Sequence, residues 1–123
     1  MISVVIPTLN AAEVIGPTLG SLSPAIFDPV LTEVIISDGG STDDIEAVAG
    51  ATGATLIRGE ASRGRQLAAG AAEARGEWLL FLHADTRLSE DWVKAARRHI
   101  GSRAHSKHKN SAQRMNGISH RVS

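Results

Sequence analysis

The sequence contains no cysteine, which excludes disulfide bonds and thiolate metal sites. Aromatic residues are scarce as well, so a core must consist mainly of aliphatic side chains; the four present are Phe27, Trp78, Phe81 and Trp92. No apolar run approaches a membrane span, and the apolar start at 2–6 lacks the basic segment of a signal peptide, so we expect a cytoplasmic protein. With 42% hydrophobic residues in 123, one compact domain is expected.

Acidic side chains are missing from the last quarter of the chain. Residues 1–93 hold all 13 acidic groups and five arginines, a balance of −8, whereas residues 94–123 hold eight basic groups and no acid. Apolar patterning also stops there, so we divide the chain into a folded domain at 1–100 and a basic, irregular tail at 101–123 without strands. The tail is expected to be disordered, or non-native through a truncation or a change of reading frame. It lacks stacking aromatics, so no specific nucleic-acid partner is expected.

Strand-like and helix-like segments alternate four times in the first 100 residues. The expected strands are short apolar or β-branched runs at 2–6, 31–37, 54–58 and 78–82. The expected helices cover 17–22, 43–49, 65–75 and 89–100, and Gly53 and Gly76 are expected to close two of them. This alternation predicts an α/β fold with a mostly parallel sheet and helices on both faces.

Capping residues and small residues refine the expected helices. Asn10 can cap the first helix with Glu13 as its capping-box partner; the alternative is a start at Pro17, because Gly16-Pro17 interrupts the helical pattern. Ser41 or Thr42 can cap the second helix. The third helix is rich in alanine, so it should pack close to the sheet.

Polar motifs follow three of the expected strands, at residues 7–10, 38–43 and 83–86. The carboxyl ends of parallel strands share one edge of the sheet, where ligands bind in such folds, so the motifs should lie together. His83 and Asp85 are two residues apart and would face one ligand from an extended chain. A carboxylate there suits Mg²⁺ or Mn²⁺ held together with substrate phosphates; the alternative is a strand end with a helix-capping Asp85.

The order and spacing of these motifs resemble the family 2 glycosyltransferases of the GT-A fold, which is Rossmann-like. Those enzymes open with a Val-Val-Ile-Pro-Thr-like strand, continue with an Asp-Asp-Gly-Ser-Thr-Asp-like turn and then carry an Asp-X-Asp motif. The His-Ala-Asp variant in this chain is similar to that of a bacterial subgroup. The resemblance covers residues 1–100, the nucleotide-binding half of such a domain. It implies a nucleoside-diphosphate sugar of UDP or GDP type, bound with Mn²⁺ or Mg²⁺.

The resemblance also implies roles for the matching residues. Metal binding falls to Asp85, and nucleotide contacts fall to seven residues: Thr8, Leu9, Asn10, Asp38, Arg63, His83 and Ala84. Asp38 would accept a hydrogen bond from the nucleobase, with an Asx turn as the alternative. His83 replaces the first Asp of the motif and Gly39 replaces the second Asp of the turn. His83 could bond only within its turn, and Arg63 could be solvated.

The chain lacks other parts of the family's machinery. The general base of the family is an Asp or Glu in the C-terminal half, but no carboxylate side chain follows Asp91, so the catalytic residue stays unassigned. The distal Gln-X-X-Arg-Trp-like segment is also missing. We therefore expect a truncated, inactive donor-binding part of a glycosyltransferase. A non-catalytic nucleotide-binding fragment is the alternative, and a nucleotidyltransferase ranks lower because no glycine-rich loop follows the first strand. An exposed flank of the sheet would favour a homodimer.

Overall fold

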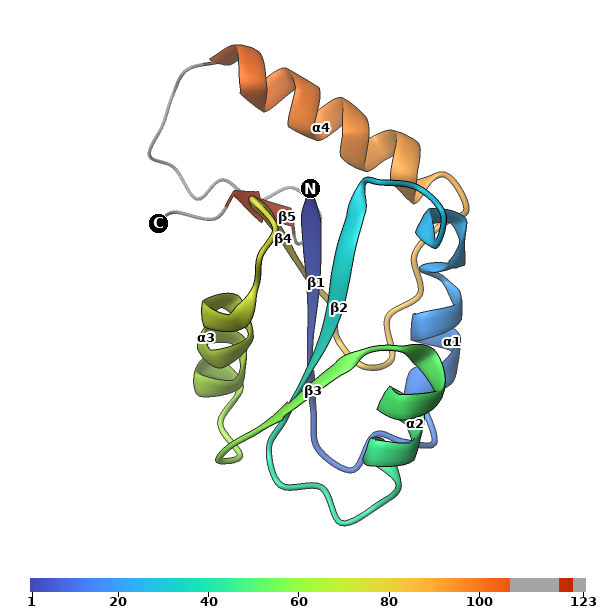
Figure 1. The fold of residues 1–123 in the computed structure, drawn as a ribbon, viewed down its shortest axis with the longest axis vertical. Helices are drawn as coiled ribbons and strands as arrows, with labels where there is room; N and C mark the ends of the chain where they lie inside the picture. The colour runs from blue at the N-terminus through green and yellow to red at the C-terminus, as the bar shows by residue number, and fades with distance from the viewer. Residues whose placement is uncertain (107–117, 121–123) are drawn as a thin grey trace.

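The structure is a computed structural model that describes residues 1–106 and 118–120. Within these residues one sheet contains five strands: β1 (Ile2–Thr8), β2 (Leu31–Asp38), β3 (Thr55–Arg58), β4 (Trp78–Phe81) and β5 (Ile118–His120). Their order is β3-β2-β1-β4-β5; the first four are parallel, and β5 pairs antiparallel with β4 (Figure 1). The predicted mostly parallel sheet is confirmed.

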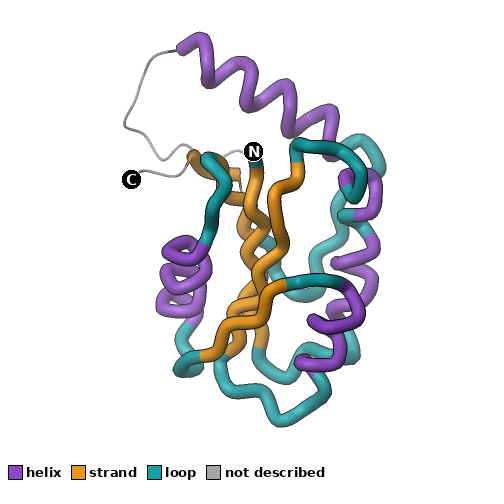
Figure 2. The backbone as a smooth tube through the Cα atoms, in the orientation of Figure 1, coloured by secondary structure: helices purple, strands orange, loops and turns teal. Residues whose placement is uncertain are grey.

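Helices cover both faces of this sheet, as the sequence predicted. The described helices are α1 (Ile15–Gly20), the 3₁₀ helix η1 (Ser23–Ala25), α2 (Ile45–Thr52), α3 (Arg63–Glu73) and α4 (Trp92–Ser106). α3 lies on one face, and α1, α2 and α4 lie on the other (Figures 1 and 2). None of the described helices has the length and apolar composition needed to cross a membrane.

The larger core fills the space between the sheet and α1, α2 and α4. Its fully buried side chains are aliphatic and include Ile2, Val4, Ile6, Ile15, Ile36 and Ile45. Two of the four aromatic residues, Trp78 and Trp92, join this core. The ring of Trp78 meets His99 of α4 edge-on, with 5.7 Å between the ring centroids, and so helps to seat α4 over the start of β4. The core is therefore mainly aliphatic, as predicted.

α3 packs closely against the other face through small residues. A methyl group added at Gly70 would lie 2.3 Å from Cγ1 of Val5 in β1, well inside van der Waals contact. The predicted close approach of this helix is therefore confirmed, and Gly70 is its tightest point in the described structure.

The two glycines expected to end helices differ in their roles. Gly53 ends α2 in the left-handed conformation, with φ at 77°. Gly76 does not cap α3, because that helix ends with Ala74 in an extended conformation. A side chain at Gly76 would lie 2.8 Å from the backbone nitrogen of Ser3, so glycine is required there for space.

A mostly buried carboxylate ties the amino ends of β1 and β2 to the loop after α3. Glu33, with a side chain 10% exposed, accepts hydrogen bonds from the Ser3 hydroxyl at 2.7 Å and the Arg75 backbone N–H at 2.6 Å. Burial raises the pKa of Glu33, but these hydrogen bonds and the Arg75 charge outweigh burial and place the pKa below its ordinary value. Glu33 therefore stabilises this end of the sheet as a carboxylate.

Helix boundaries and the tail differ from the sequence predictions. α1 follows Val14 and α2 follows Asp44, and neither helix has a side-chain cap. α4 starts at Trp92 and continues past residue 100 to Ser106, since no proline interrupts it and basic residues suit a helix C-terminus. The predicted absence of a strand after residue 100 is wrong, because β5 pairs antiparallel with β4 and forms the last strand of the sheet. The other residues of the predicted tail lie outside the described part of the chain.

Candidate functional site

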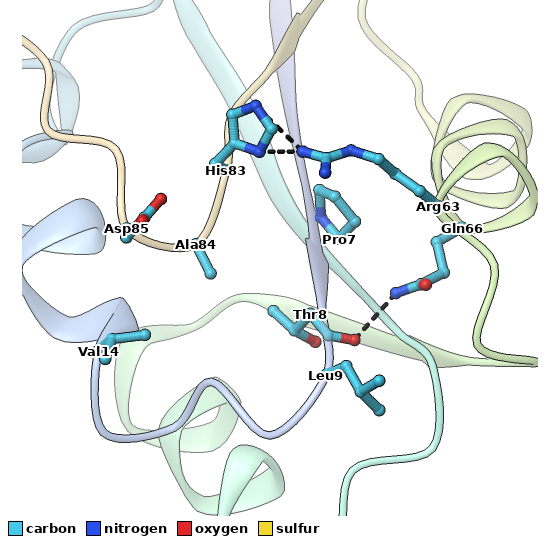
Figure 3. Close-up of a pocket in the computed structure, with 9 residues that line it drawn as sticks. All are labelled: Pro7, Thr8, Leu9, Val14, Arg63, Gln66, His83, Ala84 and Asp85. Carbon is cyan, nitrogen blue, oxygen red and sulfur yellow. Dashed lines mark hydrogen bonds between the residues drawn. The ribbon is translucent and has the colours of Figure 1, made fainter.

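A cavity lies where the order of the strands reverses. From β1 the chain proceeds outward through β2 to β3 and then places β4 on the other side of β1. In open α/β sheets this reversal leaves a crevice at the carboxyl ends of the two strands. The cavity there measures about 390 Å³. It is lined by Pro7, Thr8, Leu9, Val14, Arg63, Gln66, His83, Ala84 and Asp85 (Figure 3).

Six of the eight site residues predicted from the sequence line this cavity: Thr8, Leu9, Arg63, His83, Ala84 and Asp85. In Figure 3, Arg63 and Gln66 enter from α3 on one side, while Asp85 and Val14 lie on the opposite side. Asn10 and Asp38 are outside the lining: Asn10 lies in the loop after β1, and Asp38 is the last residue of β2. The cavity thus combines an apolar wall, a cation and a carboxylate.

Asp38 is fully buried at the end of β2, and its carboxylate is bonded within the chain. Oδ1 accepts from the hydroxyls of Thr8, at 2.7 Å, and Ser41, while Oδ2 accepts from the N–H groups of Gly40 at 3.0 Å and Ser41 at 2.7 Å. Burial raises the pKa of Asp38, but the hydrogen bonds from Ser41 and Thr8 outweigh it and lower the pKa. This arrangement is the Asx turn that the sequence left open, and the nucleobase contact stays a prediction.

Asn10 joins the loop after β1 to the loop after β2. Its φ of 52° is left-handed, a conformation that asparagine tolerates better than most residues. Its N–H donates to Ser41 Oγ at 2.7 Å, and its Oδ1 accepts from the Thr42 N–H at 2.9 Å. The predicted helix cap at Asn10 is therefore wrong, because the side chain bonds the neighbouring loop. Together with Asp38, these bonds make the two loops one unit beside the cavity.

Gln66 in α3 is a cavity residue that the sequence analysis missed. It is 7% exposed, and its Nε2 donates to the backbone carbonyl of Thr8 at 2.9 Å (Figure 3). The same Nε2 donates to the backbone carbonyl of Ser37, also at 2.9 Å. One amide group therefore holds the ends of β1 and β2 together from above the sheet. The sequence contained a signal: Gln66 lies four residues before Gly70, so both share the face of α3 that meets the sheet.

Arg63 and His83 contact each other across the cavity wall. The Arg63 guanidinium lies within bonding distance of both ring nitrogens of His83, at 3.0 Å from Nε2 (Figure 3). A guanidinium only donates hydrogen bonds, so the ring nitrogen that receives one is unprotonated. The contact places a permanent positive charge at the cavity.

A turn, and not an extended strand, carries His83 and Asp85 to the cavity. β4 ends at Phe81, and residues 83–86 form a turn in which the Thr86 N–H donates to the His83 carbonyl at 3.1 Å. The prediction that the two residues share one side of an extended chain is wrong for this reason. The fully buried Thr18 of α1 donates its hydroxyl to the Ala84 carbonyl at 2.6 Å, which anchors the turn.

The donor set of the cavity fits a metal ion that arrives with a diphosphate. Among the nine described lining residues, Asp85 is the only carboxylate and His83 the only imidazole. No group of three or more His, Cys, Asp or Glu side chains in the described residues could hold a metal ion by itself. Mg²⁺ and Mn²⁺ are often held by one or two protein carboxylates together with substrate phosphates and water. Asp85 meets this requirement, whereas the ring nitrogens of His83 already contact the Arg63 guanidinium.

Comparison with known proteins decides the family. The chain matches the model of glycosyl transferase family 2 over residues 3–106. It belongs to this family. It is 36% identical over 93 residues to the glucosyl-3-phosphoglycerate synthase of Mycolicibacterium paratuberculosis, a match that covers 68% of this chain and 28% of the relative. It is also 35% identical over 97 residues to a PGL/p-HBAD biosynthesis glycosyltransferase of Mycobacterium bovis, with 73% of this chain and 37% of the relative covered.

Solved structures agree on the GT-A glycosyltransferase fold. The structure of residues 1–349 of Staphylococcus aureus TarS superposes with a TM-score of 0.73 at 25% identity, covering 82% of this chain and 32% of that one. Glucosyl-3-phosphoglycerate synthase from Mycobacterium tuberculosis, in complex with Mn²⁺, UDP and glucosyl-3-phosphoglycerate, gives 0.65 at 29% identity, with 76% and 37% covered. The chain thus spans about a third of the length of these family members.

Proposed function

We propose that this chain binds the nucleoside diphosphate of a sugar donor in the cavity between β1 and β4, as the donor-binding part of a glycosyltransferase. The observation that carries this proposal is the cavity itself, which sets an apolar wall, a cation and a carboxylate around one space at the strand reversal. A nucleoside diphosphate carries the matching groups: a flat base, an anionic diphosphate and oxygens that bind metal.

The lining residues divide between these groups. Leu9 and Val14, about half exposed at 52% and 51%, offer apolar surface to the base. Arg63 offers a planar guanidinium to the diphosphate, which it can bind in a bidentate manner. Asp85 would hold the metal. A bound metal would neutralise the negative charge of the leaving diphosphate. His83 and Ala84 complete the wall around Asp85, and Thr8 shapes the end of β1.

The finer identity of the ligands is also proposed. We favour Mn²⁺ over Mg²⁺, because a relative of 29% identity has been solved with Mn²⁺. We favour UDP over GDP, because a relative of 29% identity has been solved with UDP and Mn²⁺. A general base is needed to deprotonate the acceptor, and no carboxylate follows Asp91 in this sequence. We therefore assign no catalytic base, and the step that we propose for this chain is donor binding. Cytoplasmic location and a homodimer stay predictions.

Calorimetric titration tests the proposal. UDP and GDP are titrated into the wild type, each with Mn²⁺, with Mg²⁺ and without metal. Asp85→Asn should keep metal-free UDP binding and lose the gain that Mn²⁺ provides, since an amide oxygen is a much poorer ligand than a carboxylate. Glu90→Gln is the matched control, because Glu90 is exposed and outside the cavity lining, and it should behave as the wild type. Equal binding of UDP by Asp85→Asn and wild type with Mn²⁺ would refute the metal role, and no binding of either nucleotide would refute the donor site.

A further inference from the structure

The 83–86 turn, which carries Asp85, accepts a hydrogen bond from one buried hydroxyl, that of Thr18. Thr18 lies in α1, is fully buried, and donates its Oγ1–H to the backbone carbonyl of Ala84 at 2.6 Å. Ala84 lies between His83 and Asp85, so this bond acts on the peptide that joins the two polar residues of the cavity. The other bond within the turn, from the Thr86 N–H to the His83 carbonyl at 3.1 Å, spans the same peptides.

The surroundings of Thr18 indicate that its hydroxyl serves the 83–86 turn and neither a ligand nor α1. Thr18 is absent from the cavity lining, so its hydroxyl does not face a ligand. α1 has only six residues and no side-chain cap, so its own hydrogen bonds do not call for a buried hydroxyl at this position. Loss of this bond would remove a hydrogen-bond donor from the carbonyl of the half-buried Ala84, so the turn is expected to stay where the Thr18 hydroxyl reaches it.

We propose that Thr18 is a positioning residue that fixes the 83–86 turn, and through it the Asp85 carboxylate, in the conformation that receives a metal-bound diphosphate. The metal part of this inference rests on the proposed function; the positioning of the turn does not. Thr18 acts through the Ala84 carbonyl and touches no ligand. Removal of its hydroxyl should therefore loosen the turn and leave the rest of the cavity in place.

Matched variants separate this role from general stability. Thr18→Val removes the hydroxyl and keeps the shape, and Thr18→Ser keeps the hydroxyl. Ser37→Ala is the control, because the Ser37 hydroxyl also donates to a backbone carbonyl, that of Gln66, at 2.6 Å on the other side of the sheet. Ser37 lies outside the 83–86 turn, so its loss should not loosen that turn.

Hydrogen exchange of the ligand-free chain tests the positioning directly. The Thr86 amide should exchange about tenfold faster in Thr18→Val than in the wild type, and at the wild-type rate in Thr18→Ser and Ser37→Ala. The amides of Val34 to Ile36 in the interior strand β2 report global opening of the protein. Their exchange rates should therefore follow the global stability of each variant. An unchanged Thr86 rate in Thr18→Val, or an equal acceleration at Thr86 and in β2, overturns the proposal. If Thr18→Val does not fold, Thr18→Ala takes its place; failure of both, with Thr18→Ser folded, shows a global role and also overturns it.

Titration of the same variants with UDP tests the link to the metal. Thr18→Val should lose most of the gain in UDP affinity that Mn²⁺ provides, with metal-free binding unchanged and with rescue in Thr18→Ser. A parallel loss of metal-free and metal-dependent binding would overturn the link. If the wild type shows no gain from Mn²⁺, the proposed metal site fails, and hydrogen exchange alone still decides whether Thr18 positions the turn.

Discussion

Replacing Gly70 by alanine tests how closely α3 is held against the sheet. The added methyl group would lie 2.3 Å from Cγ1 and 3.3 Å from both Cβ and Cγ2 of Val5, which is fully buried in β1. Rotation of the Val5 side chain moves Cγ1 but leaves Cβ 3.3 Å from the added methyl group, which is still closer than an ordinary contact. Carbon atoms prefer separations of about 3.5–4.0 Å, so α3 must move away by about an ångström.

The expected energies follow from this geometry. Overpacking of a well-packed core costs about 3 kcal/mol at the upper end of its usual range. Alanine in place of glycine within a helix returns about 1 kcal/mol, so Gly70→Ala should destabilise the protein by about 2 kcal/mol. Val5→Ala alone removes two buried methyl groups and should also cost about 2 kcal/mol. In the double variant the new methyl group enters the space that Val5 vacates, so the total should be about 2 kcal/mol instead of about 4 kcal/mol.

Urea unfolding followed by circular dichroism measures these differences. Gly50→Ala in α2 is the matched control, since a methyl group there meets nothing within 4 Å and its φ is not positive. This variant should be more stable than the wild type by up to about 1 kcal/mol. If Gly70→Ala is as stable as the wild type, or if the two single changes add within about 0.5 kcal/mol in the double variant, the close packing of α3 on β1 is refuted.

Two further predictions concern buried polar groups. The lowered pKa of Glu33 means that its stabilising effect is present above the unfolded pKa near 4.5 and is lost as the pH falls through the folded pKa, so Glu33→Gln should cost about 2 kcal/mol at pH 7 and much less near pH 3. Urea unfolding at both pH values checks this, and an equal cost at both would contradict the role of the carboxylate bonded to Arg75. Gln66→Glu should destabilise the protein more than Gln66→Leu, because a carboxylate offers no N–H to the carbonyls of Thr8 and Ser37 and adds a buried charge. Thermal unfolding of both variants checks the order, and the reverse order would contradict it.

The fold could be predicted from the sequence because its signals are local and repeated. Apolar runs such as 78–82 are too short for buried helices, and their alternation with helical segments specifies a parallel sheet. Helix starts could not be predicted in the same way. Asn10 and Ser41 are good capping residues, but in the structure they bond each other's loops across 31 positions of sequence. Long-range hydrogen bonds of this kind leave no trace in a local pattern.

The candidate site was predicted only in part, and the division has a physical cause. Residues at or just after the end of a strand, such as Thr8 and His83, reach the cavity because strand ends converge at the reversal of strand order. Gln66 was missed because a polar residue in a helix is read as exposed unless the partner of the helix is known. Its burial becomes evident only when Gly70 is seen to bring α3 onto β1.

The hydrogen bonds of the buried Asp38 carboxylate indicate that this residue supports the site indirectly. Both of its oxygens are already bonded, to Thr8 at the end of β1 and to Gly40 and Ser41 in the loop after β2. A ligand could therefore bind Asp38 only in competition with these bonds. Residues that contact a nucleotide directly should instead be those with groups exposed in the cavity, such as Leu9 and Arg63. We expect Asp38 to serve the cavity indirectly, because its bond to the Thr8 hydroxyl is one of those that hold the start of the loop with Leu9. On this reasoning a motif residue of the family can be essential to the site and still touch no ligand.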